Sequence, residues 1–149
     1  MVNTKLTQHF SLQEMTRTNV KGADNTPTAS VIKNLQRVCT WLEDLRREWN
    51  ERYGSGDDPI VINSAYRSPA VNRAVGGVGN SNHLTGCAAD IRVSGMSQAL
   101  RYAVLLMDIA DARQEDFDEI LLERSASDIW LHFAVRESKN RRKVRFINQ

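Results

Sequence analysis

Residues 81–93 read Ser-Asn-His-Leu-Thr-Gly-Cys-Ala-Ala-Asp-Ile-Arg-Val, a polar segment that passes through a glycine into a predicted strand. The strand covers residues 88–93, and its side chains alternate between two faces. One face is apolar and is formed by Ala89, Ile91 and Val93. Asp90 lies on the other face with the small Ala88. When the apolar face packs inward, the Asp90 carboxylate faces outward with room beside it for a bulky ion.

A later predicted strand, residues 129–135, divides its faces in the same way. Its apolar face is formed by Ile129, Leu131, Phe133 and Val135. The opposite face carries Trp130, His132 and Ala134. In the preceding strand, residues 119–123, alternation places Glu123 on the face away from the apolar one. These patterns predict that several polar side chains gather on one side of a sheet.

His83, Asp90 and His132 are the candidates for a metal site on that side. Two imidazoles and one carboxylate are a sufficient protein set for catalytic zinc, which keeps its fourth position for water. The chain has three histidines but no His-Glu-x-x-His helix, so no general zinc-protease signature decides the matter. Spacing alone leaves a second interpretation open: a surface histidine, a strand-edge aspartate and a partly buried histidine without metal.

The remaining pattern predicts the fold class. Apolar residues recur at spacings of three and four from Val31 to Trp49, which indicates a long amphipathic helix after a start at residues 26–28. A second helix covers residues 100–109, with Ser94 or Ser97 as its cap. Further strands are expected at residues 60–64 and 143–147. The order predicts one α+β domain over residues 1–149, an antiparallel sheet flanked by helices.

Composition narrows the function classes. The chain has 149 residues, is 41% hydrophobic and 26% charged, and carries a net charge of +2, which excludes collagen-like and disordered classes. The last part contains a basic run: Arg136, Lys139, Arg141, Arg142, Lys143 and Arg145. Such a run is usually a solvated strand edge, so no nucleic-acid partner is expected. No membrane segment or signal peptide is visible, which predicts synthesis in the cytoplasm, and two cysteines suit a reducing compartment.

The segment at residues 81–90 fits the SxHxxGxAxD pattern of the M15 metallopeptidases, which include D-Ala-D-Ala carboxypeptidases and peptidoglycan endopeptidases. Other segments resemble the M15A-like branch in the same order: residues 10–15, 25–27, 64–69, Asn72, residues 74–77 and residues 130–132. The resemblance covers nearly the whole chain. It implies the fold shared by hedgehog domains and D,D-peptidases.

The resemblance also implies roles for individual residues. His83, Asp90 and His132 would bind Zn²⁺, and Arg67 would contact a substrate carboxylate or the developing oxyanion. The resemblance identifies the general base less directly. Some relatives carry an acidic residue three positions before the last histidine, where this chain has Ile129. The branch it resembles has a glutamate closing the preceding strand, which corresponds to Glu123.

Asp128 is the second candidate for the base, although its place between two strands favours a turn-capping role. Ser81, Asn72 and Trp130 are expected to support the site or to contact substrate. Ser81 would do so through a hydrogen bond to the loop or to a metal ligand. Trp130 would either form a wall of the groove or simply pack on the sheet face.

These roles predict zinc-dependent hydrolysis of peptidoglycan stem peptides, by a D,D-carboxypeptidase or an endopeptidase. Without a visible export signal, a phage or prophage lysis enzyme that reaches the cell wall after release fits the sequence. The alternative is a non-catalytic zinc module of the same fold, like hedgehog-type signalling domains, that binds cell-wall peptide or a partner without cutting.

Overall fold

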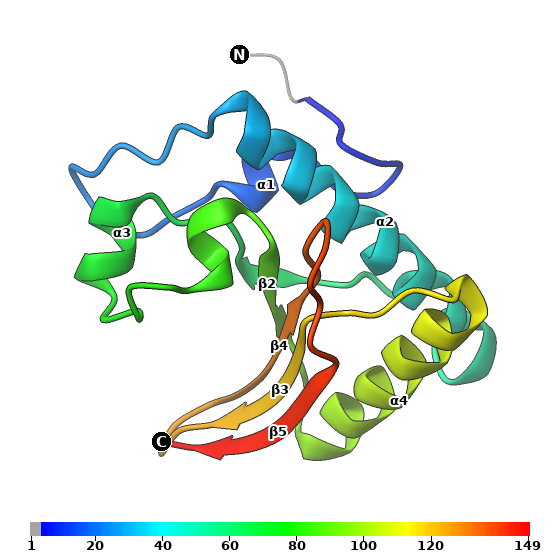
Figure 1. The fold of residues 1–149 in the computed structure, drawn as a ribbon. Helices are drawn as coiled ribbons and strands as arrows, with labels where there is room; N and C mark the ends of the chain where they lie inside the picture. The colour runs from blue at the N-terminus through cyan, green and yellow to red at the C-terminus, as the bar shows by residue number, and fades with distance from the viewer. Residues whose placement is uncertain (1–3) are drawn as a thin grey trace.

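The computed structural model describes residues 4–149, which form helices and one five-stranded sheet (Figure 1). The strands are β1 (Ile62–Ser64), β2 (Ala88–Arg92), β3 (Glu119–Arg124), β4 (Ile129–Ala134) and β5 (Lys143–Asn148). Their order across the sheet is β1-β2-β4-β3-β5. The predicted α+β class is therefore confirmed.

The strand pairs are antiparallel, except that β5 runs parallel to β3. The parallel pair arises because the chain leaves β4, passes β3 and returns as the edge strand on its far side. Asn140 closes the connecting loop: its Oδ1 accepts from the Arg136 amide at 2.8 Å, and its Nδ2 donates to the Arg136 carbonyl at 2.9 Å. The expected antiparallel sheet is confirmed for β1 to β4, and β5, parallel to β3, is the exception.

Among the described residues, five helical segments complete the fold: α1 (Leu12–Met15), α2 (Ala29–Arg52), α3 (Pro69–Ala74), the 3₁₀ segment η1 (Asn82–Thr85) and α4 (Met96–Arg113). The side chain of Thr28 caps α2 by accepting from the Val31 amide. The predicted serine cap of α4 is wrong, because the N-cap is Gly95 and makes no side-chain cap bond. Because glycine has no side chain to form a cap hydrogen bond, the sequence does not mark it as the N-cap of α4.

The hydrophobic core lies between the sheet and the two long helices. Figure 1 shows α2 and α4 on one side of the sheet, with α3 and η1 on the other. Most side chains that the alternation assigned inward lie in this core, among them Ala89, Ile91, Leu131 and Phe133, whereas Ile129 at the start of β4 lies outside it. Trp41 of α2 packs on Phe133, with ring centroids 5.6 Å apart. The opposite sheet face, which carries Asp90 and His132, is left for the polar groups.

Gly86 joins η1 to β2 at a close approach to α2. Its φ of 76° is left-handed, and a Cβ there would lie 2.9 Å from both Cγ1 and O of Val31. Only glycine meets both demands without strain. This contact fixes η1, and with it His83, against the body of the domain.

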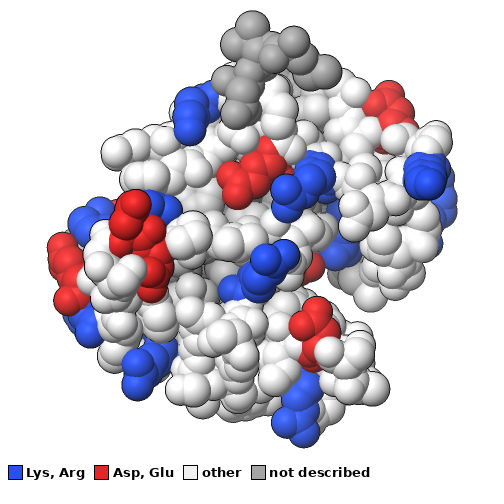
Figure 2. All heavy atoms as spheres, turned by 180° about the vertical axis from the view of Figure 1, so that it is seen from behind, with Lys and Arg blue, Asp and Glu red and all other residues white. Residues whose placement is uncertain are grey.

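The surface carries both signs of charge. On the side opposite to the view of Figure 1, acidic and basic side chains are interspersed (Figure 2). Cys39 and Cys87 are both buried and free. Within residues 4–149, no helix is long and apolar enough to cross a membrane.

Candidate metal centre

His83, Asp90 and His132 converge at one point of the open sheet face. The Asp90 Oδ1 atom lies 3.3 Å from His83 Nε2 and 3.1 Å from His132 Nδ1. One ligand atom from each residue lies within 4.8 Å of the others, and this is the single such group found among the described residues. Asp90 and His132 are direct register partners on β2 and β4, which explains why their side chains meet.

The three side chains fit a zinc ion by donor type and by burial. The residues are 3%, 8% and 6% exposed, so water does not already solvate the donor atoms fully. Two neutral imidazoles and a carboxylate leave one tetrahedral position for water or substrate, as a catalytic zinc site requires. The far nitrogen of each ring also has a partner. His83 Nδ1 lies 2.6 Å from the carbonyl oxygen of Ala65, and His132 Nε2 lies 3.0 Å from Glu119 Oε1.

Arg67 lies at the edge of this cluster, on the loop between β1 and α3. Its Nη2 is 3.2 Å from Asp90 Oδ2, and its Nε donates to the Ser64 hydroxyl at 3.2 Å. Its Nη1 approaches Asn72 Oδ1 at 3.5 Å, and Asn72 Nδ2 donates to the Val78 carbonyl at 2.9 Å. Asn72 therefore links the arginine to the glycine-containing loop after α3. The structure brings Arg67 and Asn72 to the site.

Glu123 and Trp130 form another wall of the same site. They are cross-strand partners on β3 and β4, and Trp130 Nε1 donates to Glu123 Oε2 at 3.0 Å. The other oxygen, Oε1, accepts from Gln149 Nε2 at 2.9 Å. The carboxylate is thus held in place by two neutral donors.

Ser81 and Asp128 make local contacts instead. The Ser81 hydroxyl accepts from the His83 amide at 3.1 Å and caps η1, so it supports the loop that carries the histidine. Asp128 is exposed in the turn between β3 and β4, where its Oδ1 accepts from the Ile129 amide at 2.9 Å. Of the two predicted candidates for the base, only Glu123 therefore lines the cavity with the cluster.

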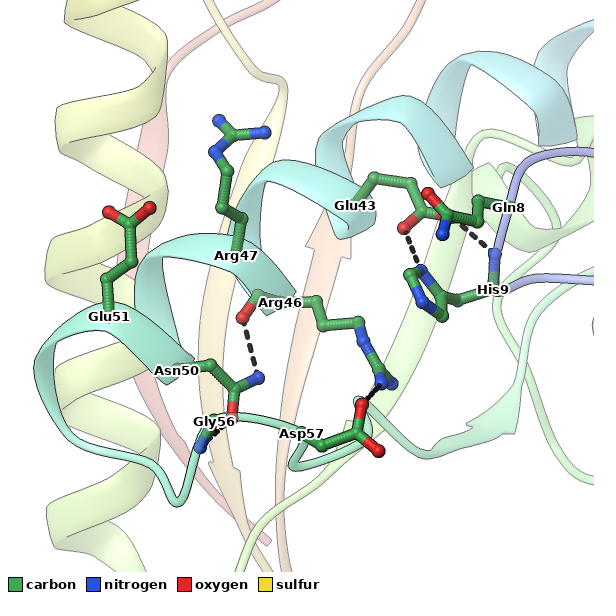
Figure 3. A pocket seen from close by; sticks show the side chains of 9 residues that line it. All are labelled: Gln8, His9, Glu43, Arg46, Arg47, Asn50, Glu51, Gly56 and Asp57. Atoms are coloured by element: carbon green, nitrogen blue, oxygen red, sulfur yellow. Dashed lines mark hydrogen bonds and ion pairs between the residues drawn. The ribbon is translucent and has the colours of Figure 1, made fainter.

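A cavity of about 470 Å³ joins these groups. Its lining includes Arg67, His83, Asp90, Glu119, Glu123, Trp130, His132, Arg136, Arg141 and Lys143. A second hollow, of about 540 Å³, lies along α2 (Figure 3). Four of its ionisable side chains pair with one another: Glu43 contacts His9 at 2.7 Å, and Arg46 contacts Asp57 at 2.7 Å. The 470 Å³ cavity, which contains the three converging residues, is therefore the better candidate for the functional site.

The charges in the cavity shift one another's pKa values. Burial disfavours the Asp90 charge, but the imidazoles of His83 and His132 outweigh burial and hold its pKa well below the usual range. Burial likewise disfavours the His132 cation, yet hydrogen bonds to Asp90 and Glu119 raise the pKa of His132 to about 9. Burial, together with the charge of Asp90, raises the pKa of Glu123 above 4.5.

Sequence reasoning missed a polar network behind His132. It contains Asn82, Asp118, Glu119, Arg136 and Arg141. Alternation on β3 places Glu119 on the face of Glu123, a signal that could have revealed it. The two arginines belong to the basic run, which was expected to be solvated, but both lie against Asp118 at 3.3 and 2.8 Å. Arg142 of the same run pairs with Asp111 and Asp116.

Comparison with known proteins agrees with this arrangement. Residues 8–133 match the family model described as Peptidase M15. The chain is also similar to the zinc D-Ala-D-Ala carboxypeptidase of Streptomyces albus G, with 31% identity over 83 residues. That match covers 56% of this chain and 31% of the relative, so the chain spans under a third of the relative's length. The family match extends from before α1 to within β4 and includes all three converging residues, and the chain belongs to the peptidase M15 family.

Proposed function

We propose that the chain is a zinc-dependent peptidase that hydrolyses peptide bonds in peptidoglycan stem peptides, as a D,D-carboxypeptidase or an endopeptidase. The observation that carries this proposal is the convergence of His83, Asp90 and His132 in one cavity with Glu123 and Arg67. Membership of the family and the name of the Streptomyces relative support both the metal and the substrate class.

The ligands would be His83 through Nε2, His132 through Nδ1 and Asp90 through its carboxylate. Zinc held by them supplies Lewis-acid chemistry, polarising the peptide carbonyl and making water easier to deprotonate near neutral pH. Arg67 Nη2, which contacts Asp90 Oδ2, compensates part of the negative charge of that ligand.

Glu123 would act as the general base and then as the acid. Its carboxylate accepts hydrogen bonds from Trp130 and Gln149, which orient it within the cavity without a competing cation. Its raised pKa improves its ability to take a proton from the attacking water and return it to the leaving amine. A carboxylate of ordinary pKa would hold that proton less well.

Arg67 would bind a substrate carboxylate or stabilise the oxyanion. A guanidinium keeps its charge at all relevant pH values and presents several donors in one plane. Ser64 and Asn72 fix the plane from behind. Stem peptides carry free carboxylates, so a cationic anchor beside the cleavage point suits them. Action at the cell wall after release, as a phage or prophage lysis enzyme, stays a prediction.

Cleavage assays test the proposal directly. Protein as isolated, treated with chelator, and reloaded with zinc would be incubated with peptidoglycan and short muropeptides, and mass spectrometry would identify new termini. We expect zinc-dependent cleavage that falls about 10²–10⁴-fold in Glu123→Gln. The matched variant Glu51→Gln, at an exposed position on α2, should cleave normally. Stoichiometric zinc binding without cleavage of any stem peptide would favour the non-catalytic binding module instead.

A further inference from the structure

We propose that Glu119 is a positioning residue, which holds the His132 ring so that its Nδ1 atom faces the metal. The inference rests on the proposed zinc site and adds a group to it. Glu119 begins β3, four residues before Glu123 on the same face. Its Oε1 lies 3.0 Å from His132 Nε2, opposite to the nitrogen that faces Asp90.

Hydrogen-bond chemistry fixes which nitrogen carries the proton. A neutral imidazole has one N–H and one lone pair, and a carboxylate only accepts. An Nε2–H that donates to Glu119 leaves the Nδ1 lone pair of His132 for the metal. His83 has the opposite arrangement, because its Nδ1 must donate to the carbonyl of Ala65. When zinc is bound and both rings are neutral, the two histidines would therefore take opposite tautomers, each set by a partner behind the ring.

Glu119 is itself held from two sides. Asn82 Nδ2 donates to Glu119 Oε1 at 2.8 Å and to Asp118 Oδ2 at 2.8 Å. The Asn82 Oδ1 atom accepts from Arg136 Nε at 2.9 Å, so the amide has a partner on each side and cannot flip without losing all three bonds. Arg141 Nη2 lies 3.4 Å from Glu119 Oε2. The carboxylate is thus oriented before any metal binds.

Strand register explains how Glu119 reaches His132. The direct partner of His132 on β3 is Leu121, and Glu119 is paired with Ala134. Glu119 therefore reaches diagonally across the pair, a span that a long side chain covers. The small side chain of Ala134, opposite to Glu119, leaves the space that this path needs.

Glu119 lines the same cavity as Glu123, which raises the question of which carboxylate is the base. The Oε1 atom of Glu119 already faces two donors, His132 and Asn82, and Oε2 faces Arg141. Glu123 has only neutral donors, the indole of Trp130 and the amide of Gln149. A carboxylate committed to a ligand and to a guanidinium suits positioning rather than proton transfer.

Nitrogen NMR of the imidazoles and zinc titration test this assignment. The chain has only three histidines, so a long-range ¹H–¹⁵N spectrum of the zinc-loaded protein can identify each tautomer. We expect His132 bound through Nδ1 with a proton on Nε2, and His83 bound through Nε2. Coordination of His132 through Nε2 in the wild-type protein would overturn the proposal without any variant.

Zinc affinity, measured by competition with a chromophoric chelator, gives the second readout. Glu119→Ala should weaken zinc binding about 10–100-fold, the usual effect of losing a partner of a ligating histidine. Glu119→Gln should retain the His132 tautomer and most of the affinity, because its amide oxygen accepts the same proton. The control Glu115→Ala removes an exposed carboxylate 3.9 Å from Arg113 and should bind zinc normally.

The outcomes separate this inference from the proposed function. Wild-type protein that binds no zinc would overturn both. Wild-type binding with equal affinity in Glu119→Ala would overturn the positioning role and leave the metal site standing. Thermal unfolding of the metal-free variants checks that they are folded. If Glu119→Ala does not fold, the wild-type spectrum decides: a proton on Nε2 of zinc-bound His132 supports the proposal, and coordination through Nε2 overturns it.

Discussion

At the scale of single residues, Glu123 combines a proposed catalytic role with a cost in stability. Its pKa is raised by burial and by the charge of Asp90, so the folded protein holds a proton on Glu123 more tightly than the unfolded chain does. The stability that this gives is present below pH 4.5 and is lost as the pH rises through the folded-state pKa. Above the folded-state pKa, the ionised carboxylate therefore destabilises the metal-free protein.

We accordingly expect metal-free Glu123→Gln to be more stable than the wild type at pH 7. The gain should stay below about 1 kcal/mol, or about 3 °C in Tm, because the side chain is only half buried. Thermal unfolding followed by circular dichroism from pH 3.5 to pH 8 measures it. The difference should shrink toward zero below pH 4.5, where both side chains are neutral. A wild type more stable at neutral pH would contradict the assigned direction of the pKa shift.

A second prediction concerns Gly86. Alanine at this position should lower the free energy of unfolding by about 1–2 kcal/mol because its backbone is left-handed, and by about 1–3 kcal/mol more because its Cβ overlaps Val31. Gly22 has a nearly equal φ, 78° against 76°, and a Cβ at that position would meet no atom within 4 Å. Gly22→Ala therefore isolates the backbone cost. Urea unfolding of both variants compares the two, and equal losses would show that the contact with Val31 is easily relieved.

The sequence identified the converging trio because each member sits in a motif or on a strand face that alternation defines. Glu119 was missed although it shares the face of Glu123, because a carboxylate at the start of a strand is commonly solvated. Arg136 and Arg141 were missed for a different reason. Their contacts with Asp118 depend on how the loop after β4 turns back, and local periodicity does not contain that information.

At the scale of elements, the loop from α3 to η1 contributes to the position of Arg67 through Asn72. A Cβ on Gly77 would lie 2.0 Å from Asn72 Oδ1, the atom that faces Arg67 Nη1. Gly77→Ala should therefore displace the Asn72 side chain and loosen the arginine. Displacements of about 1 Å near reacting groups can cost about 10²-fold in rate.

We expect Gly77→Ala to lower kcat/KM on a stem peptide about 10–100-fold while zinc affinity changes little, because the three ligands keep their own contacts. Gly79→Ala lies in the same loop, where a Cβ would meet nothing within 4 Å, and should leave kcat/KM unchanged. Steady-state kinetics with chelator competition separates the two effects. Equal activity of the Gly77 and Gly79 variants would show that the loop does not hold Arg67 in position.

The sequence predicted the location of the strands better than their order in the sheet. Alternation located the strands and their inner faces because burial on one face imposes a period of two. It could not give the order β1-β2-β4-β3-β5 or the parallel pairing of β5, because a strand pattern specifies a face and not a neighbour. The long helix α2 was predictable, because its buried residues recur at spacings of three and four along most of its length.

At the scale of the whole molecule, the sheet separates two kinds of structure. One face, under α2 and α4, is a continuous apolar core, and the other carries the cluster of ionisable groups. His83, Asp90 and His132 come from η1, β2 and β4, so a bound metal would tie together elements that the core already holds. Metal binding should therefore raise the stability of the domain, while the apolar core should stay packed without the metal.

We expect chelation to lower Tm without unfolding the domain. Free zinc at about 100 times its Kd stabilises a one-site protein by about 2.7 kcal/mol. In a chain of this size that corresponds to about 5–10 °C in Tm. Scanning calorimetry with chelator and with added zinc measures the shift, and the near-ultraviolet circular dichroism of the three tryptophans reports whether the core stays packed. Because Trp41 is fully buried against Phe133 on the far face, its signal should survive metal removal. Loss of that signal on chelation would mean that the core depends on the metal, as in a zinc finger, and would contradict the division between the two faces.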